Sequence, residues 1–343
     1  MPIQLYHLER VNNPLRKTAI SFNCLAKLGA VTRTELSECR HLLRGLITQS
    51  VRRSPITGPV LIVGMVESGV ILSSLMHQEA QSLGINTFWM CSTRRPASGV
   101  QVMEFHSHAP HHILPLPDVH IEEIWIVEDE ITTGRTILQV VRMLVEALGA
   151  RKVRIFALAD IRTPQQQCWF RESLESAHIW LSVHYVFRPA HLVPHADPCE
   201  PETFPADSRL SIVTAHPKSA DAWHLRCLRP ALQIQREPSF PNCPPFSGRM
   251  LVIGEAMDLA IRMTQNNPDL TLHHVTRSPW RVDNKNIFDC LQIEPHFYLY
   301  NLSHADVPLT ILADPIDTSS TTLLHTMLTE KGYDVRTIIP HGG

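Results

Sequence analysis

Two adjacent acids followed by hydroxyls and a glycine give the stretch IWIVEDEITTGRTI, residues 124–137, its chemical interest. The apolar run from Ile124 to Val127 predicts a strand covered on both faces, because it lacks the polar alternation of a half-exposed strand. Glu128 and Asp129 are then expected at the carboxyl end of that strand. Helical spacing resumes at once and stops at Gly149, with these residues on one apolar face: Ile137, Val140, Val141, Leu144 and Leu148.

The residues between the acids and the helix are predicted to form a strand-to-helix loop, which consists of Thr132, Thr133, Gly134, Arg135 and Thr136. We call this segment the phosphate loop. Such a loop presents backbone N–H groups and hydroxyls at the amino end of a helix, where an anion such as phosphate is favoured. Because acids lie beside it, the ligand should carry hydroxyls as well, as a phosphorylated sugar does. The alternative is an ordinary turn with solvated acids.

A second glycine-bearing segment, VGMVESG at residues 63–69, follows a predicted strand (60–63) and opens a predicted helix (70–83). Gly64 and Gly69 would allow the backbone to approach a ligand closely. Glycines after a strand are also common in α/β folds without a ligand.

Residues 91–112, CSTRRPASGVQVMEFHSHAPHH, separate the predicted strands 87–90 and 121–127 by more than a simple connection needs. Long loops in compact domains are often lids. This one carries Arg94 and Arg95, and a histidine-rich part with His106, His108, His111 and His112. A zinc site is the alternative for these histidines, but no cysteine is near the cluster and a solvated loop is the simpler interpretation.

Composition indicates an ordinary globular chain of two domains, since 343 residues with 44% hydrophobic content can bury sizeable cores. The formal net charge of −2 argues against nucleic acid or an anionic membrane as the main partner. The eight cysteines form no CxxC pair, and no signal-like or membrane-length apolar segment occurs. We therefore expect a cytoplasmic protein with reduced thiols.

Strand and helix signals alternate in two regions, which predicts an α/β fold with a parallel sheet and flanking helices in each. The expected domains are residues 1–190 and a smaller one at 248–343, separated by a proline-rich linker or arm at 191–247. The first also contains a predicted helix after the capping-box spacing Thr32–Glu35, and strands near 153–158 and 179–186. The second has predicted strands at 250–253, 270–275, 297–300, 309–312 and 335–339, and helices at 255–264 and 321–329.

The stretch from Ile124 to Thr136 resembles the PRPP-binding motif of type I phosphoribosyltransferases without a gap. The resemblance implies that Glu128 and Asp129 meet the ribose hydroxyls of PRPP and that the phosphate loop surrounds its 5-phosphate. It also implies a pyrophosphate loop, which consists of Gly64, Met65, Val66, Glu67, Ser68 and Gly69. The segment 91–112 matches the mobile loop of the family, where Arg94, Arg95, His106 and His108 would act on departing pyrophosphate.

Further sequence, STRR, EFHSHAPHH and HHVTRSPW, looks like one bacterial two-domain family found with tellurium-resistance-type stress genes. Its members carry a C-terminal domain named for the Thr-Arg-Ser-Pro motif, which here is Thr276–Pro279. Thr132 stands where hypoxanthine-guanine enzymes carry an Asp, so the motif is more similar to the orotate class. The segment 91–112 lacks the lysine-rich pattern of orotate enzymes, so the resemblance leaves the acceptor base open. The segment Ala26–Gly29 departs from the Gly-Lys-His element that members of the two-domain family carry.

The Thr276–Ser278 segment ends a predicted strand with hydroxyls and a guanidinium, Thr276, Arg277 and Ser278. Arg277 could bind a phosphate or carboxylate through two hydrogen bonds at the edge of a sheet. Alternatively, Ser278 caps a helix and Arg277 pairs with an acid of the protein.

Taken together, the residues and the resemblance predict an enzyme that transfers a phosphoribosyl group from PRPP to a nitrogen of a heterocyclic base. Mg²⁺ would be bound mainly through PRPP, with no dedicated protein metal site, and a homodimer is expected from the resemblance. The product would be a nucleotide-like metabolite of a stress-associated pathway. The alternatives are a regulator that binds PRPP without catalysis and a scaffold that uses the proline-rich arm.

Overall fold

The computed structural model describes residues 3–11, 17–103, 111–188, 212–213, 246–294, 296–302 and 307–339. His106, His108 and most of the predicted proline-rich arm lie outside these residues. The chain forms two compact units, one of Leu42–Gln235 and one of Met1–His41 with Arg236–Gly343. The sequence domains 1–190, 191–247 and 248–343 stay a prediction, since a compact unit and a sequence domain need not coincide.

A five-stranded parallel sheet in the order β4-β3-β7-β8-β9 forms the centre of the Leu42–Gln235 unit. Its central strands are mostly buried and mostly apolar, as is typical of parallel strands covered on both faces. The α/β class predicted from the sequence is therefore confirmed. The strands are β3 (Val60–Gly64), β4 (Thr87–Cys91), β7 (Glu123–Ile131), β8 (Lys152–Asp160) and β9 (Trp180–Phe187).

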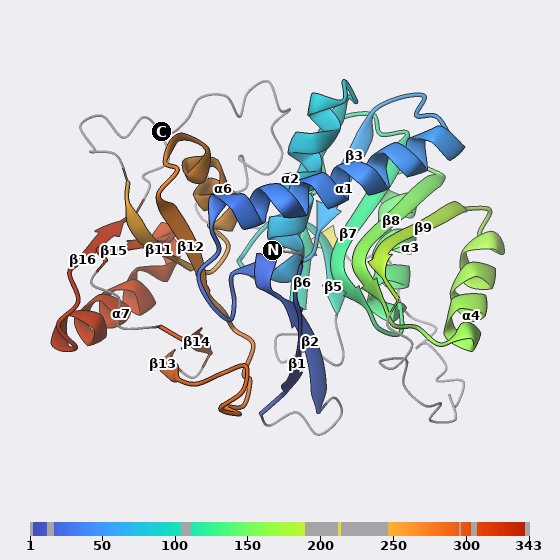
Figure 1. The fold of residues 1–343 in the computed structure, drawn as a ribbon. Helices are drawn as coiled ribbons and strands as arrows, with labels where there is room; N and C mark the ends of the chain where they lie inside the picture. The colour runs from blue at the N-terminus through green and yellow to red at the C-terminus, as the bar shows by residue number, and fades with distance from the viewer. Residues whose placement is uncertain are drawn as a thin grey trace. The chain divides into compact units, whose positions relative to one another are not determined.

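Helices cover both faces of this sheet, as Figure 1 shows. Helices α3 (Arg135–Leu148) and α4 (Pro164–Glu175) share one buried apolar cluster with alternate strand residues such as Leu61, Ile124 and Val153. Helices α1 (Arg33–Arg53) and α2 (Ser68–Ser82) contact the strand residues that point to the other face. Trp89 donates to Ser73 of α2 at 2.9 Å, and Arg154 donates to Ser50 of α1 at 2.6 Å. The register across β4, β3, β7 and β8 places Trp89 and Arg154 on one side, so the unit has three layers.

A buried ionic network joins α1 to the sheet. Arg154 of β8 is fully buried, pairs with Glu123 of β7, and donates to the carbonyl oxygens of Ser50 and Ser54 at 2.8 and 2.6 Å. Lys152 also reaches Glu123, at 3.0 Å. These contacts give the buried guanidinium partners in Glu123 and in the Ser50 and Ser54 carbonyls near the end of α1, so the charges are buried with compensation.

The segment 91–112 differs from the single long loop predicted from the sequence. It contains β5 (Gly99–Met103), which pairs antiparallel with β6 (His111–Leu114) and also with β10 (Ile212–Val213). Val100, Val102 and Leu114 are buried in the apolar cluster of the main sheet. The prediction was wrong because the alternation in GVQVM is itself a strand signal.

The second unit contains a smaller parallel sheet in the order β12-β11-β15-β16, so the predicted second α/β region is present. Helix α7 (Thr318–Glu330) and the hairpin β13 (Cys290–Glu294) and β14 (Phe297–Tyr300) share its apolar cluster. Helix α6 (Met257–Asn266) connects β11 and β12 and contacts both. The sheet strands are β11 (Gly248–Ile253), β12 (Leu270–Val275), β15 (Leu309–Leu312) and β16 (Val335–Ile338).

The N-terminal residues belong to this second unit, which the sequence pattern did not indicate. A hairpin of β1 (Leu5–Glu9) and β2 (Thr18–Phe22) packs its apolar side against Trp280 and Tyr300. Val31 forms two backbone hydrogen bonds with Leu272 of β12, at 2.7 and 2.9 Å. The pairing joins residues far apart in sequence, so local periodicity carries no sign of it.

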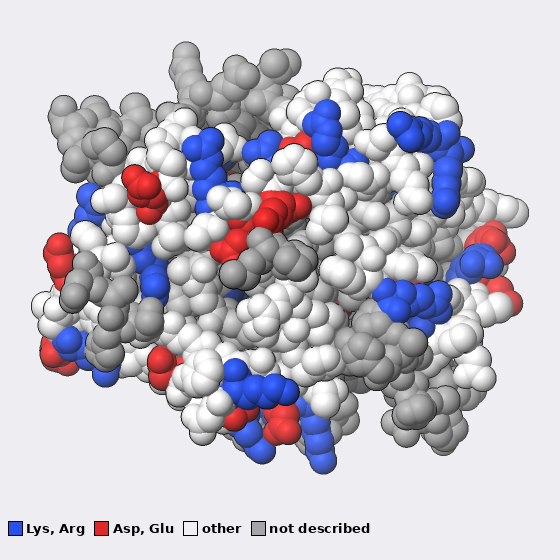
Figure 2. Space-filling view, viewed as in Figure 1, with Lys and Arg blue, Asp and Glu red and all other residues white. Residues whose placement is uncertain are grey.

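Charged side chains of both signs are interspersed on the face shown in Figure 2, in agreement with the formal net charge of −2. Within the described residues, no helix is both long enough and apolar enough to span a membrane.

Candidate active site

The two predicted PRPP loops follow neighbouring strands. β3 and β7 are parallel, and their register ends at Gly64 and Val127. The pyrophosphate loop leaves β3 at that point, and the acids follow Val127 directly in β7. The carboxyl edge of the sheet therefore brings together the two segments that the sequence singled out, which are about sixty residues apart in the chain.

Close backbone contact fixes the pyrophosphate loop. A Cβ on Gly64 would meet Ser73 Oγ at 2.2 Å and the carbonyl oxygen of Gly69 at 2.5 Å. A Cβ on Gly69 would meet the carbonyl oxygen of Val127 at 3.0 Å. The amide of Gly69 donates to the carbonyl of Met65 at 2.8 Å, and the Val66–Glu67 peptide is cis. Both glycines are therefore needed for packing, in addition to any approach of a ligand.

Arg94 lies against the pyrophosphate loop. Its guanidinium is 3.7 Å from a carboxylate oxygen of Glu67 and donates to the carbonyl of Val66 at 3.4 Å. Both side chains are largely buried. The backbone amide of Arg95 donates to Thr93 Oγ1 at 3.1 Å. The structure thus places one of the two predicted cations beside the loop that it was expected to serve.

β7 extends further than the sequence predicted, through both acids to Ile131. It keeps its register with β8 as far as Ile131 and Asp160, beyond the end of β3. Successive side chains of a strand point to opposite faces, so Glu128 and Asp129 leave β7 on opposite sides. Both are half-buried, and Asp129 Oδ1 accepts a hydrogen bond from the amide of Glu130 at 3.0 Å.

The phosphate loop is shorter than predicted, because α3 already begins at Arg135. Gly134 precedes the helix with a φ of 85°, a left-handed conformation that favours glycine. Thr133 Oγ1 accepts a hydrogen bond from the amide of Arg135 at 3.3 Å. The amides of the first turn of α3 and the hydroxyl-bearing residues Thr132 and Thr133 therefore lie at the carboxyl edge of the sheet, as an anion site requires.

Sequence reasoning missed the groups that support this loop. Asp160 ends β8 and binds Arg162 through two hydrogen bonds of 2.9 Å, and both side chains are buried. The guanidinium of Arg162 lies 4.7 Å from the ring centroid of Phe170. A Cβ on Gly134 would meet Phe170 Cδ2 at 2.8 Å. The signal was an Asp two residues after the predicted strand 153–158, followed two residues later by Arg.

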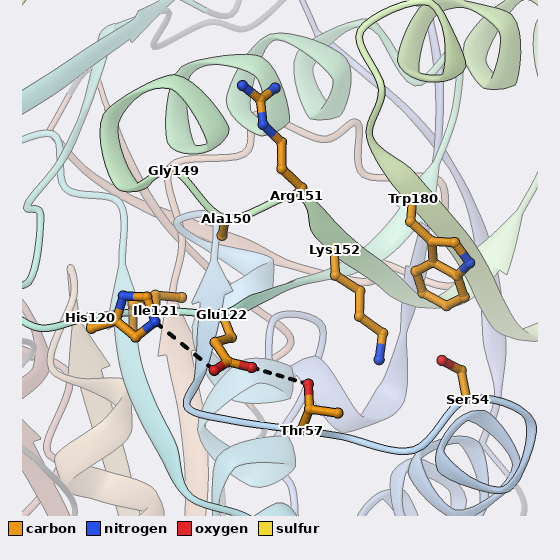
Figure 3. Close-up of a pocket in the computed structure, with 10 residues that line it drawn as sticks. All are labelled: Ser54, Thr57, His120, Ile121, Glu122, Gly149, Ala150, Arg151, Lys152 and Trp180. Carbon is orange, nitrogen blue, oxygen red and sulfur yellow. Dashed lines mark hydrogen bonds and ion pairs between the residues drawn. The ribbon is translucent and has the colours of Figure 1, made fainter.

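A cavity of about 520 Å³ lies at the opposite end of the sheet, where β7, β8 and β9 begin (Figure 3). There Glu122 accepts a hydrogen bond from Thr57 Oγ1 at 3.0 Å and lies 4.0 Å from His120 Nε2. None of the predicted PRPP residues lines this cavity. The carboxyl edge remains the candidate site, because ligands of parallel sheets bind beyond the carboxyl ends of the strands.

The predicted second-unit residues follow β12 directly. Thr276 exchanges two backbone hydrogen bonds with Tyr298, and its hydroxyl accepts one from the amide of Ser278 at 3.1 Å. The Arg277 guanidinium lies 4.6 Å from the ring centroid of Phe297. Within the described residues, no group of three or more histidine, cysteine or acidic side chains could hold a metal ion in either unit.

The family described as "Phosphoribosyl transferase" matches residues 9–188, more than half of the chain. The chain belongs to this family. It is accordingly a phosphoribosyltransferase, and the matched region includes both predicted PRPP loops. The TRSP-type identity of the C-terminal region stays a prediction.

No curated protein matches the chain significantly. Among solved structures, APRTase from Giardia lamblia complexed with 9-deazaadenine is 19% identical, with 54% of this chain and 94% of that chain covered and a TM-score of 0.35. Adenine phosphoribosyltransferase from Trypanosoma brucei is 12% identical, with coverages of 60% and 85% and a TM-score of 0.37. The enzyme from Saccharomyces cerevisiae is 14% identical, with coverages of 51% and 93% and a TM-score of 0.35.

Gly134→Ala is expected to lower the free energy of unfolding by more than the roughly 1–2 kcal/mol of a left-handed alanine, because its Cβ would also collide with Phe170. Gly149→Ala is the matched control, since Gly149 also has a positive φ but open space at its Cβ position. Urea denaturation of both variants measures the difference. Equal losses would contradict the contact between Gly134 and Phe170.

Proposed function

We propose that this phosphoribosyltransferase transfers a 5-phosphoribosyl group from PRPP to a ring nitrogen of a heterocyclic base and releases pyrophosphate. The observation that carries the proposal is the junction of the pyrophosphate loop with the acids of β7 at one sheet edge. PRPP has a diphosphate, vicinal hydroxyls and a second phosphate, and the edge offers a group suited to each. Membership of the phosphoribosyl transferase family supports the same reaction.

In this proposal, the phosphate loop binds the 5-phosphate at the amino end of α3, and Glu128 and Asp129 accept hydrogen bonds from the ribose hydroxyls. The backbone of the pyrophosphate loop binds the diphosphate, and Arg94 meets the pyrophosphate chiefly as it departs. The half-buried carboxylates are oxygen donors of the kind Mg²⁺ prefers, and a Mg²⁺ ion held mainly by PRPP would add positive charge beside the diphosphate.

The reaction is a displacement at the anomeric carbon. The bond from that carbon to the diphosphate oxygen breaks and its electron pair leaves with pyrophosphate, a bond to the base nitrogen forms, and the proton of that nitrogen passes to solvent. Positive charge develops on the ribose ring, where the β7 carboxylates stabilise it, while negative charge develops on the leaving group beside Arg94. In this proposal, the groups that face the developing positive charge therefore lie on β7, and Arg94, which faces the negative charge, lies in the segment after β4.

The proposed acceptor is a heterocyclic base. The proposed product is a nucleotide-like metabolite of a stress response. The resemblance of the sequence to the TRSP-containing family supports this acceptor and product class. A regulator that binds PRPP without turnover is the alternative, and it predicts PRPP binding with no pyrophosphate release for any base.

For the second unit, we propose that the edge after β12 binds an anionic group of the product or its precursor. Thr276, Arg277 and Ser278 lie beyond the carboxyl end of a parallel strand, where α/β sheets bind ligands. The contact with Phe297 holds the guanidinium plane, which favours recognition of a phosphate through two hydrogen bonds.

Changing Glu128 and Asp129 to Gln and Asn should weaken PRPP binding by about 1.5–3 kcal/mol for each lost charged hydrogen bond. Because the two side chains leave β7 on opposite sides, each single variant is compared with the double variant by calorimetric titration with PRPP and Mg²⁺. Glu122→Gln, just before the same strand at its other end, should have no effect. Unchanged affinity in a folded double variant would reject the assignment.

Arg94→Ala combined with Arg95→Ala should lower turnover more than PRPP affinity, since these charges would meet pyrophosphate chiefly as it departs. Pyrophosphate release in a screen of heterocyclic bases measures turnover, and calorimetry measures affinity. Arg151→Ala, beside the cavity at the amino end of the sheet, is the control. An equal loss in both quantities would indicate ground-state binding instead.

Arg277→Lys should weaken binding of nucleoside 5-monophosphates to the full-length protein by about 1.5 kcal/mol or more, because lysine keeps the charge but loses the planar pair of donors. Arg281→Lys is the control, since Arg281 forms an exposed ion pair of 3.0 Å with Glu9 that should tolerate the change. No binding by the wild type, or equal binding by wild type and Arg277→Lys, would refute the proposal.

A further inference from the structure

The residues directly after β4 are hydrogen-bonded to the pyrophosphate loop. The amide of Ser92 donates to the carbonyl of Gly64 at 2.9 Å, where the loop begins. Ser92 Oγ accepts a hydrogen bond from the amide of Val66 at 3.0 Å, within the loop. Ser92 is buried, so water does not compete for either contact. Its hydroxyl therefore helps to set the course of the loop between Gly64 and Glu67.

A buried histidine orients that hydroxyl. His112 lies on β6, and its Nδ1 is 3.2 Å from Ser92 Oγ. The two strand segments are joined next to this contact by reciprocal backbone hydrogen bonds of 2.8 Å between Thr93 and Ile113. His112 is buried as well, so it does not belong to a solvated histidine-rich surface at this position.

The contact restricts a group that would otherwise rotate. A serine hydroxyl can donate in several directions and can accept from more than one donor. With the amide of Val66 as its donor and the imidazole as its other partner, Ser92 Oγ has one favourable orientation. A loop that receives a diphosphate through its backbone depends on such support, because small displacements of a binding group weaken binding and catalysis strongly.

We propose that His112 is a positioning residue, which acts through Ser92 to hold the pyrophosphate loop in the shape that receives the diphosphate of PRPP. The inference rests on the proposed function and adds a residue from β6 to the machinery of the carboxyl edge. It gives His112 a specific effect: the residue supports binding of the diphosphate and has no part in binding the 5-phosphate.

The test compares two probes, PRPP with Mg²⁺ and ribose 5-phosphate, by calorimetric titration of the full-length protein. Ser92→Ala and His112→Leu should each weaken PRPP binding by about threefold to tenfold, the equivalent of one hydrogen bond, and leave ribose 5-phosphate binding unchanged. The double variant should lose no more than the larger single loss, because the two residues act in series. His112→Asn, which keeps a hydrogen-bonding atom near the Nδ1 position, should restore most of the affinity.

Thr87→Val is the matched control, since Thr87 Oγ1 and His77 Nδ1 form another buried hydroxyl–imidazole contact, of 2.9 Å, in the same unit. It should lower stability without changing affinity for either probe. Equal weakening of both probes in His112→Leu would show general damage and overturn the inference, as would unchanged PRPP binding in folded Ser92→Ala and His112→Leu. Failure of the wild-type protein to bind PRPP would instead refute the proposed function.

Discussion

The candidate site depends on the close packing of the pyrophosphate loop against β7, which is possible because glycines stand at the points of contact. Gly64 and Gly69 lie against each other, and Gly69 also lies against the carbonyl of Val127. A side chain at Gly69 would press on the carbonyl of Val127 in the strand that carries the acids, and one at Gly64 would collide with Ser73 and Gly69. The covalent structure of PRPP limits its reach, so the diphosphate and ribose sites of the proposed function must keep a defined separation. Close packing of two backbones provides that separation with little freedom to vary.

The two ends of the main sheet are built for different tasks. At the amino end, Arg154 is buried with Glu123 and donates to carbonyls near the end of α1, so its charge is committed to the fold. At the carboxyl end, Glu128, Asp129 and the phosphate loop remain partly accessible. Buried ion pairs need full compensation, whereas binding groups must exchange water for ligand. Under the proposed function, this separation gives the acids near the two ends of β7 different roles.

The N-terminal residues illustrate how the chain is divided. The β1–β2 hairpin and Val31 are completed by Trp280, Tyr300 and Leu272, which follow them by more than two hundred residues. The family match from residue 9 to 188 and the compact units therefore cut the chain at different places. A segment can belong by sequence to one domain and contribute its apolar surface to another core, because burial depends on which surface is available in space.

The sequence by itself determined the parallel strands, every helix named above except α4, and the loops that follow β3 and β7, because each is encoded in local apolar periodicity, glycine placement and capping residues. The capping box at Thr32 and Glu35 is present, with hydrogen bonds of 2.9 and 3.2 Å, and Gly149 ends α3 with a φ of 73°. The tertiary structure decided the rest: that Arg94 lies at the pyrophosphate loop, that Asp160, Arg162 and Phe170 support Gly134, and that His112 reaches Ser92. These contacts join different strands and helices, so they exist only once the sheet order and register are set. Local sequence specifies conformation, whereas long-range pairing chooses the neighbours of each side chain.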